Sequence, residues 1–282
     1  ECTFDEKLKS QYSHYKKRIL LDTSSPCGFM GEDPRYEGGD VVSHLEYFTH
    51  VYTICPFTAQ ILKYQTDTEY IPVCFPYPQD KFVDYEELTH SDKRYDVMYY
   101  GQVHHTAYIG MLREMSKYKH KFTTISRIGL TDEAIKDYVT DYNLSSEQKW
   151  NMLSNSKVCV GFNLLFLRSP HLKHMRKYQD KYDTTGLLST FGSNKVAPQM
   201  KTRMIESAAC KTLMLAFEDP YRVIEEWFTP NEHFIYWNGF DDLNNKLAEI
   251  TTNYEKYWPI VENAHEHAKQ YSVENFWRKI NE

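Results

Sequence analysis

The alternation of apolar and polar segments along the chain predicts strands and helices that follow one another. Short apolar runs rich in β-branched and aromatic residues indicate buried strands, and segments with apolar residues three or four positions apart indicate helices. The expected strands lie at 18–22, 50–54, 70–75, 96–100, 122–128, 157–161, 212–217 and 233–236. The expected helices lie at 3–17, 56–64, 108–118, 133–138, 146–153, 200–210, 221–228, 241–254 and 257–280. Strands that alternate with helices indicate an α/β fold with parallel sheets.

The segment 194–217 is the part of this pattern that carries the most chemistry. Pro198 is placed where a helix can begin, because the amides of a first turn have no partner. Met204, Ile205 and their neighbours recur at helical spacing up to a turn at Cys210, and a short buried strand follows. The sequence therefore predicts a helix whose start faces the carboxyl end of the sheet, where ligands of such folds bind.

Three charged residues lie near the start of this helix. Lys201 and Arg203 are cations at a helix end whose dipole already favours an anion. Glu206 lies about one turn deeper and is able to accept hydrogen bonds from a pair of hydroxyl groups. This combination suits a ligand with a diphosphate and a ribose, and the alternative is a surface helix with ordinary charges.

Length and local composition favour two domains. A chain of 282 residues exceeds the usual size of one domain. We place an acceptor-side domain at 1–80, a nucleotide-sugar-binding domain at 95–270 and the end of a returning C-terminal helix at 271–282. With about three strands the first domain is small, or an upstream part is missing.

Charge and hydropathy exclude some classes of protein. The net charge of −6 and the pI of about 6.1 give no general nucleic-acid footprint. No apolar run approaches the ~20 residues that a membrane helix needs. The six cysteines form no C-x-x-C pair, so we expect free thiols and a cytoplasmic location, with disulfides as the alternative.

A glycine after the expected strand at 96–100 is a second candidate site. Gly101 would let the backbone approach a phosphate, with Gln102 and His104 beside it; the alternative is simple turn chemistry. Neither a G-x-G-x-x-G fingerprint nor a P-loop occurs, which disfavours nicotinamide and NTPase functions. The pair His265 and His267 has no third metal ligand nearby in the sequence, so we expect no metal site.

The residues from 95 to 277 resemble the nucleotide-binding half of GT-B glycosyltransferases. The resemblance is closest to the spore-maturation, CgeB-like branch and looser to exostosin-type transferases. It is carried by the segments 95–101, 203–210, 228–236 and 271–276, with 50–55 and 70–76 matching the end of the first domain. The resemblance implies two Rossmann-like domains with parallel sheets and a cleft between them.

The resemblance also implies roles for individual residues. Glu206 would hold the ribose, Lys201 and Arg203 the diphosphate, and Gly101 the phosphate turn. The loop with Arg127 and Ile128 would frame the base. The last helix would return to the first domain.

The expected function is transfer of a sugar from a nucleotide diphosphate sugar, linked to UDP, to a hydroxyl of a glycan or other acceptor. Retaining members of this group often have an acid eight positions before the ribose acid, where this chain has Pro198, so we expect inversion. No Asp-x-Asp occurs, and we expect no obligatory metal or other cofactor. The base would be one of four residues of an acidic region: Asp22, Asp33, Asp40 or His44. A non-catalytic nucleotide- or sugar-binding module and a nucleotide-sugar epimerase remain as alternatives.

Overall fold

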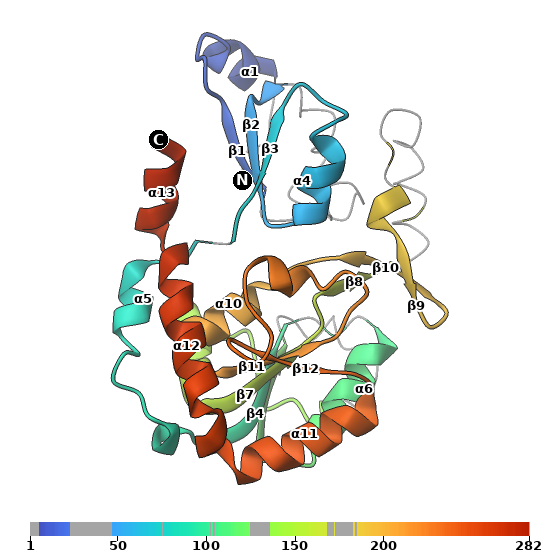
Figure 1. Cartoon of the computed structure of the whole chain (residues 1–282), viewed down its shortest axis with the longest axis vertical. Helices are drawn as coiled ribbons and strands as arrows, with labels where there is room; N and C mark the ends of the chain where they lie inside the picture. The colour runs from blue at the N-terminus through green and yellow to red at the C-terminus, as the bar shows by residue number, and fades with distance from the viewer. Residues whose placement is uncertain are drawn as a thin grey trace. The chain divides into compact units, whose positions relative to one another are not determined.

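The structure is a computed structural model that describes residues 6–22, 47–74, 76–101, 103, 105–124, 136–167, 172, 183 and 185–281. The chain forms two compact units, each described here by itself. Unit 1 comprises 1–75 and 163–200, and unit 2 comprises 76–162 and 201–282. This division differs from the expected one, because 163–200 leaves the larger unit and joins the smaller one. Figure 1 shows the elements of both units along the chain.

Unit 1 contains two three-stranded sheets among its described residues. The parallel sheet has the order β1-β2-β3, and the antiparallel sheet has the order β8-β10-β9. The strands are β1 (Ile19–Asp22), β2 (His50–Thr53), β3 (Glu69–Pro72), β8 (Leu164–Phe166), β9 (Ser189–Phe191) and β10 (Asn194–Pro198). The helical elements are α1 (Glu6–Tyr12), α4 (Pro56–Leu62) and the short 3-10 helix η5 (Thr185–Leu187).

The two chain segments of unit 1 are joined by side-chain contacts. Gln65, which follows α4, donates to the Asp183 carbonyl at 3.1 Å and accepts from the Asp183 amide at 2.6 Å. The backbone of Gly186 in η5 lies against Ile61 of α4. The segment 163–200 lies in the sequence between the two parts of unit 2, and we call it the excursion. These contacts attach it to α4, the helix that covers β3.

Unit 2 is built on one six-stranded parallel sheet with the order β12-β11-β7-β4-β5-β6. The strands are β4 (Tyr95–Tyr100), β5 (His120–Thr124), β6 (Asp141–Tyr142), β7 (Ser156–Gly161), β11 (Leu213–Phe217) and β12 (Ile235–Trp237). In register, Val158 of β7 lies beside Val97 of β4 and Leu213 of β11. These central residues are fully buried, as parallel strands covered on both faces require.

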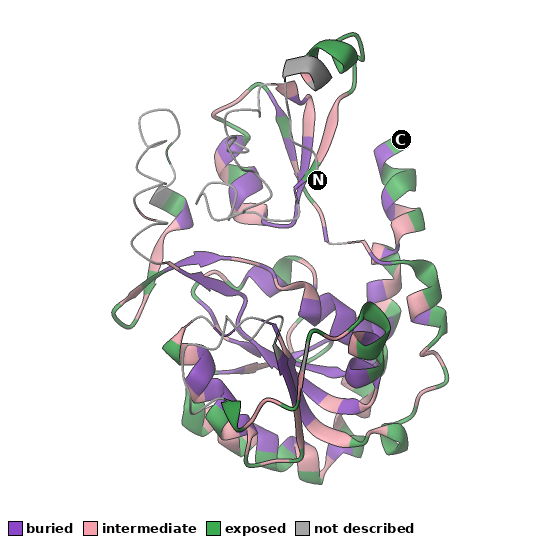
Figure 2. Cartoon of the chain, turned by 180° about the vertical axis from the view of Figure 1, so that it is seen from behind, coloured by how far each residue is buried: buried purple, intermediate pink, exposed green. Residues whose placement is uncertain are grey.

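Helices cover both faces of this sheet. The α-helices are α5 (Gln79–Val83), α6 (Thr106–Met115), α8 (Ser146–Ser154), α10 (Thr202–Ala209), α11 (Phe240–Thr252), α12 (Trp258–Ala268) and α13 (Val273–Asn281). The 3-10 helices are η3 (His90–Asp92), η6 (Val223–Glu226), η7 (Tyr254–Tyr257) and η8 (Lys269–Tyr271). Helices α8, α10 and α12 pack together on one face, and α6 and α11 on the other (Figure 1). Figure 2 shows buried residues along the strands between these layers.

Several expected elements differ from the structure, and the helix expected at 3–17, for example, ends at Tyr12. Pro198 does not begin a helix: it is the last residue of β10, and α10 begins at Thr202. The expected helix at 221–228 is only the 3-10 turn η6, because Arg222 adopts a left-handed conformation (φ 49°) and Asp219 binds the first amides. The expected last helix is interrupted at Ser272, whose backbone is extended and forms a parallel bridge with Tyr77.

Among the described residues, no helix combines the length and the apolarity needed to cross a bilayer.

Candidate functional site

The candidate site lies at the carboxyl ends of β4 and β7. The chain runs from β4 outward through β5 to β6, and from β7 in the other direction through β11 to β12. The gap between β4 and β7 is therefore the topological switch point, where open α/β sheets bind ligands. A glycine ends each strand here, with Gly101 directly after β4 and Gly161 as the last residue of β7.

Both glycines make room for side chains of helix α10, Gly101 for Arg203 and Gly161 for Met204. Gly101 has a φ of +133°, which side-chain-bearing residues rarely adopt, and a Cβ there would lie 2.4 Å from Nη2 of Arg203. A Cβ on Gly161 would lie 2.9 Å from Cε of Met204 and 3.6 Å from Cδ of Arg203. The sequence of the strand ends thus lets helix α10 approach the sheet closely.

Arg203 lies in the first turn of α10, and its guanidinium group is buried. The side chain is 9% exposed, and Cζ lies 4.5 Å from the ring centroid of Tyr99 and 5.5 Å from that of Tyr100. The aromatic faces favour the cation. Among the described residues, however, Nη1 is buried without a hydrogen-bond partner. A buried donor without a partner is costly, so this atom indicates a place for an acceptor.

Glu206 lies one turn further along α10 and is 3% exposed. Its Oε1 lies 2.5 Å from Nζ of Lys149, whereas Oε2 is buried with no hydrogen-bond partner in the described part of the chain. Burial raises the pKa of the Glu206 carboxyl to about 8, and the nearby hydroxyl of Tyr77 acts in the opposite direction. The free oxygen indicates a place for a hydrogen-bond donor.

The partner of Glu206 comes from helix α8. This helix begins with a capping box in which Ser145 and Gln148 satisfy each other's backbone amides. Lys149 in its first turn lies between two aromatic rings, 5.4 Å from the centroid of Tyr100 and 5.5 Å from that of Trp150. Burial lowers the pKa of Lys149. The site therefore combines two cations, one carboxylate and two unsatisfied polar atoms, and it suits a ligand with anionic groups and hydroxyls.

The structure describes five of the sequence-predicted site residues. Gly101, Arg203 and Glu206 come together as above, and Lys201 lies at the N-cap of α10. Asp22 is buried at the end of β1 in unit 1. The remaining candidates lie outside the described residues: Gln102, His104, Arg127, Ile128, Asp33, Asp40 and His44.

Sequence reasoning missed three residues of this site, namely Lys149, Tyr77 and Gly161. Lys149 lies more than 50 positions from Glu206 in the sequence, and no local spacing joins the two. Tyr77 follows the expected strand at 70–75, and no role was predicted for it. Gly161 did have a signal, because a glycine at the end of a buried strand often marks a close backbone approach.

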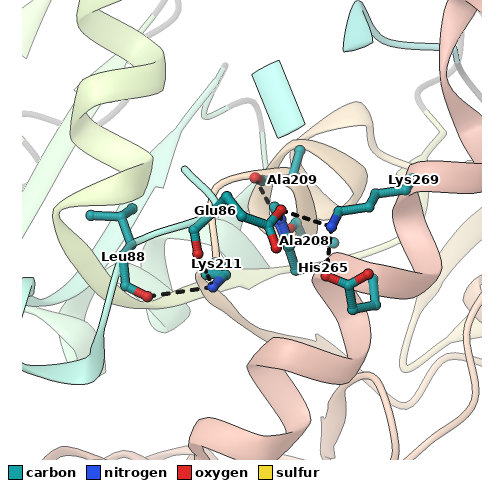
Figure 3. Close-up of polar contacts among 8 residues, drawn as sticks. Glu86, Leu88, Ala208, Ala209, Lys211, His265 and Lys269 are labelled. Carbon is teal, nitrogen blue, oxygen red and sulfur yellow. Dashed lines mark hydrogen bonds and ion pairs between the residues drawn. The ribbon is translucent and has the colours of Figure 1, made fainter. Parts of the chain in front are cut away.

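A second polar cluster lies at the other end of α10. Nδ1 of His265 lies 3.2 Å from the Ala208 carbonyl and 3.1 Å from the Ala209 carbonyl, and Nε2 lies 3.3 Å from Oε2 of Glu86 (Figure 3). Lys269 contacts the same Glu86 carboxylate at 2.7 Å. This cluster attaches α12 and the segment after α5 to the C-terminal carbonyls of α10.

The sequence showed no third metal ligand near His265, but the fold brings two carboxylates to it. The ligand atoms of Glu86, His265 and Glu266 lie within 4.8 Å of one another. The Lys269 ammonium group already lies between the two carboxylates, at 2.6 Å from Glu266. His267 does not belong to this cluster, because its Nε2 lies 2.7 Å from the Trp227 carbonyl.

Comparison with known proteins gives a family and a fold. A family profile described as glycosyl transferase-like matches residues 141–282, which is half of the chain. Comparison with the curated proteins gave no significant match.

Three solved structures illustrate the structural likeness. A glycosyltransferase from Rickettsia africae is 12% identical with a TM-score of 0.57, covering 100% of this chain and 82% of that one. HepE of Anabaena, solved with UDP-glucose, is 8% identical with a TM-score of 0.55, covering 86% of this chain and 65% of that one. TarM of S. aureus is 14% identical with a TM-score of 0.51, covering 86% of this chain and 44% of that one.

These likenesses confirm the expected fold class, an α/β fold of the GT-B kind with parallel sheets and two Rossmann-like domains. The chain spans less than half of the length of TarM and about two thirds of that of HepE.

Proposed function

This chain belongs to the glycosyl transferase-like family, and we propose that it transfers a sugar from a UDP-sugar to a hydroxyl group of a glycan or another acceptor. One observation carries the proposal. Two polar side chains on adjacent turns of α10, the Arg203 guanidinium and the Glu206 carboxyl, each present a buried atom that has no partner among the described residues, at the switch point of the sheet. Within the family we propose the CgeB-like branch, on the segments 95–101, 203–210, 228–236 and 271–276.

The two unsatisfied atoms fit different parts of a nucleotide sugar. Oε2 of Glu206 would accept hydrogen bonds from the ribose hydroxyls, each worth roughly 1.5–3 kcal/mol when one partner is charged. Arg203 and Lys201 would bind the diphosphate at the start of α10, where the helix dipole favours an anion. Gly101 would form the phosphate turn, with the Arg203 guanidinium packed beside it.

The proposed reaction is a single displacement with inversion. The acceptor oxygen attacks the anomeric carbon as the bond from that carbon to the diphosphate oxygen breaks. The acceptor proton passes to a carboxylate or imidazole, and we propose Asp22, Asp33, Asp40 or His44 for this role. The cations of α10 would stabilise the charge that develops on the departing UDP, so no divalent ion is needed.

Calorimetric titration of UDP-glucose into the protein in EDTA tests the donor site. We expect binding without a divalent ion, and binding that is 10–100-fold weaker in Glu206→Gln, at 1.4 kcal/mol per decade. Glu262→Gln, on the exposed side of α12, is the matched control and should bind like the wild type. Equal affinities of both variants would refute the role of Glu206, and loss of all binding in EDTA would refute metal independence.

Release of free UDP tests the reaction. Incubation of a bound UDP-sugar with a panel of glycans should produce free UDP and a glycosylated product. Binding without turnover would point to a non-catalytic module, and conversion of the sugar without free UDP would point to an epimerase.

A further inference from the structure

We propose that Lys149 is the positioning residue for Glu206. Its ammonium group donates a hydrogen bond to Oε1 of the carboxyl group and leaves Oε2 as the oxygen that accepts hydrogen bonds from the ligand. The inference rests on the proposed function, because it concerns the same donor site. It adds a residue from another helix, with a role that is exerted through Glu206 and not through a contact with the sugar.

The first support is the geometry of the pair. Nζ of Lys149 lies 2.5 Å from Oε1, while Oε2 has no partner among the described residues. The Glu206 side chain is 4% exposed and that of Lys149 is 25% exposed. A carboxylate held at one oxygen by a fixed cation cannot rotate freely, so the second oxygen keeps one orientation.

The second support is the way in which Lys149 itself is held. The rings of Tyr100 and Trp150 lie within 5.5 Å of its ammonium group. Trp150 is fixed in turn by an edge contact with Tyr77 at a centroid distance of 5.6 Å. A lysine confined in this way loses little further freedom when it contacts the carboxylate, unlike a lysine on an open surface.

The third support is the balance of charge around Glu206. Burial disfavours the ionised carboxylate, and an adjacent cation favours it. Among the described residues, the groups that face Glu206 are Lys149 from α8, the hydroxyl of Tyr77 and the thiol of Cys210 at the end of α10. Cys159 of β7 lies nearer to Arg203, and His265 of α12 contacts the far end of the helix. Lys149 is therefore the cation among these groups that directly contacts the carboxyl.

The effect of removing the Lys149 ammonium group on the affinity for UDP-glucose should depend on pH. In Lys149→Met the pKa of the carboxyl should rise by about one unit from its value of about 8, which lowers the ionised fraction about tenfold at pH values below the pKa and much less above it. We expect affinity for UDP-glucose to fall roughly tenfold at pH 7 and less than about twofold at pH 9. Lys149→Arg, which keeps the charge, should restore most of the affinity at pH 7.

Lys157→Met is the matched control. Lys157 forms an ion pair of similar geometry in the same unit, 2.7 Å from Asp96, with a side chain that is 22% exposed. Its loss should leave the pH profile of UDP-glucose binding unchanged. A change equal to that of Lys149→Met would overturn the proposal, because it would reflect a general loss of stability.

A direct contact between Lys149 and the diphosphate predicts a different result. In that case Lys149→Met would weaken binding equally at pH 7 and pH 9, and also in a Glu206→Gln background. On our proposal Lys149→Met has less than about a twofold effect in that background. An undiminished effect there would overturn the proposal.

NMR titration of the ¹³C-labelled Glu206 carboxyl, in protein without ligand, separates this inference from the proposed function. A titration midpoint that moves to higher pH in Lys149→Met supports the positioning role even if no nucleotide sugar binds the wild type. An unchanged midpoint in a protein that does bind UDP-glucose would overturn the inference and leave the proposed function standing.

Discussion

Gly101 lies against a guanidinium group because it has no Cβ. The closest atom to an added methyl group would be Nη2 of Arg203, at 2.4 Å, and the positive φ adds backbone strain. The arginine is the more flexible partner, so it would be displaced from the rings of Tyr99 and Tyr100. A residue with no side chain thus sets the position of the cation in the site.

Gly101→Ala tests this arrangement. We expect the free energy of unfolding to fall by about 1–3 kcal/mol from strain, and UDP-glucose binding to weaken at least tenfold because Arg203 moves. Gly239→Ala is the control, since Gly239 has a φ of +82° but no atom within 4 Å of an added Cβ. It should lose stability and keep its affinity. Similar losses of affinity in both variants would contradict the prediction.

The raised pKa of Glu206 predicts a pH dependence of stability. In the folded protein the pKa is about 8, against 4.5 in the unfolded chain. Between these values the folded state keeps a proton that the unfolded state has released, so the free energy of unfolding falls as pH rises. Urea denaturation should therefore show that the free energy of unfolding falls less between pH 5 and pH 8 in Glu206→Gln than in the wild type. Parallel curves for variant and wild type would show that burial does not perturb this carboxyl.

At the scale of elements, α10 is held at both ends by groups from distant parts of the chain. Its first turn meets the strand-end glycines, and its last carbonyls meet the buried ring of His265 from α12. Ala208 and Ala209, which bear those carbonyls, are themselves fully buried. The site helix is thus positioned by α12 as well as by the sheet.

His265→Leu should therefore destabilise the fold. It leaves the buried Ala209 carbonyl without the imidazole donor, while the Ala208 carbonyl keeps a hydrogen bond from the Lys211 amide. An unsatisfied buried group costs about 1–3 kcal/mol. Urea denaturation should show a loss in this range or above it. Lys269→Met removes a more exposed ion pair of the same cluster and should cost less than about 1 kcal/mol. The reverse order of the two effects would show that the histidine contact does not stabilise α10.

The sequence predicted elements better than it predicted their ends. The strand at 212–217 and the helix at 146–153 lie within a residue or two of β11 and α8, because the pattern of apolar residues marks both. The break in the last helix was missed, since Ser272 is extended only because its backbone pairs with Tyr77. The site was found where its residues share one helix, as with Arg203 and Glu206, and missed where tertiary packing supplied the partner Lys149.

At the scale of the whole molecule, the described donor-site residues belong to unit 2. Hydrogen exchange with and without UDP-glucose should therefore show protection in peptides that cover the end of β4 and the start of α10. Peptides of β1, β2 and β3 should show much smaller changes, because ligand stabilises the elements that it contacts most directly. Protection confined to β1–β3 would place the ligand elsewhere.

The excursion 163–200 also has a consequence for biosynthesis. β7 pairs with β4, which precedes it, and with β11, which is translated only after the excursion. At about 5–20 residues per second, the ribosome needs roughly 2–8 s to pass this stretch. During that time the second edge of β7, a row of free amides and carbonyls on an apolar strand, has no partner. Nascent chains arrested at residue 200 should therefore self-associate or recruit a chaperone, and chains arrested well beyond β11 should do so less.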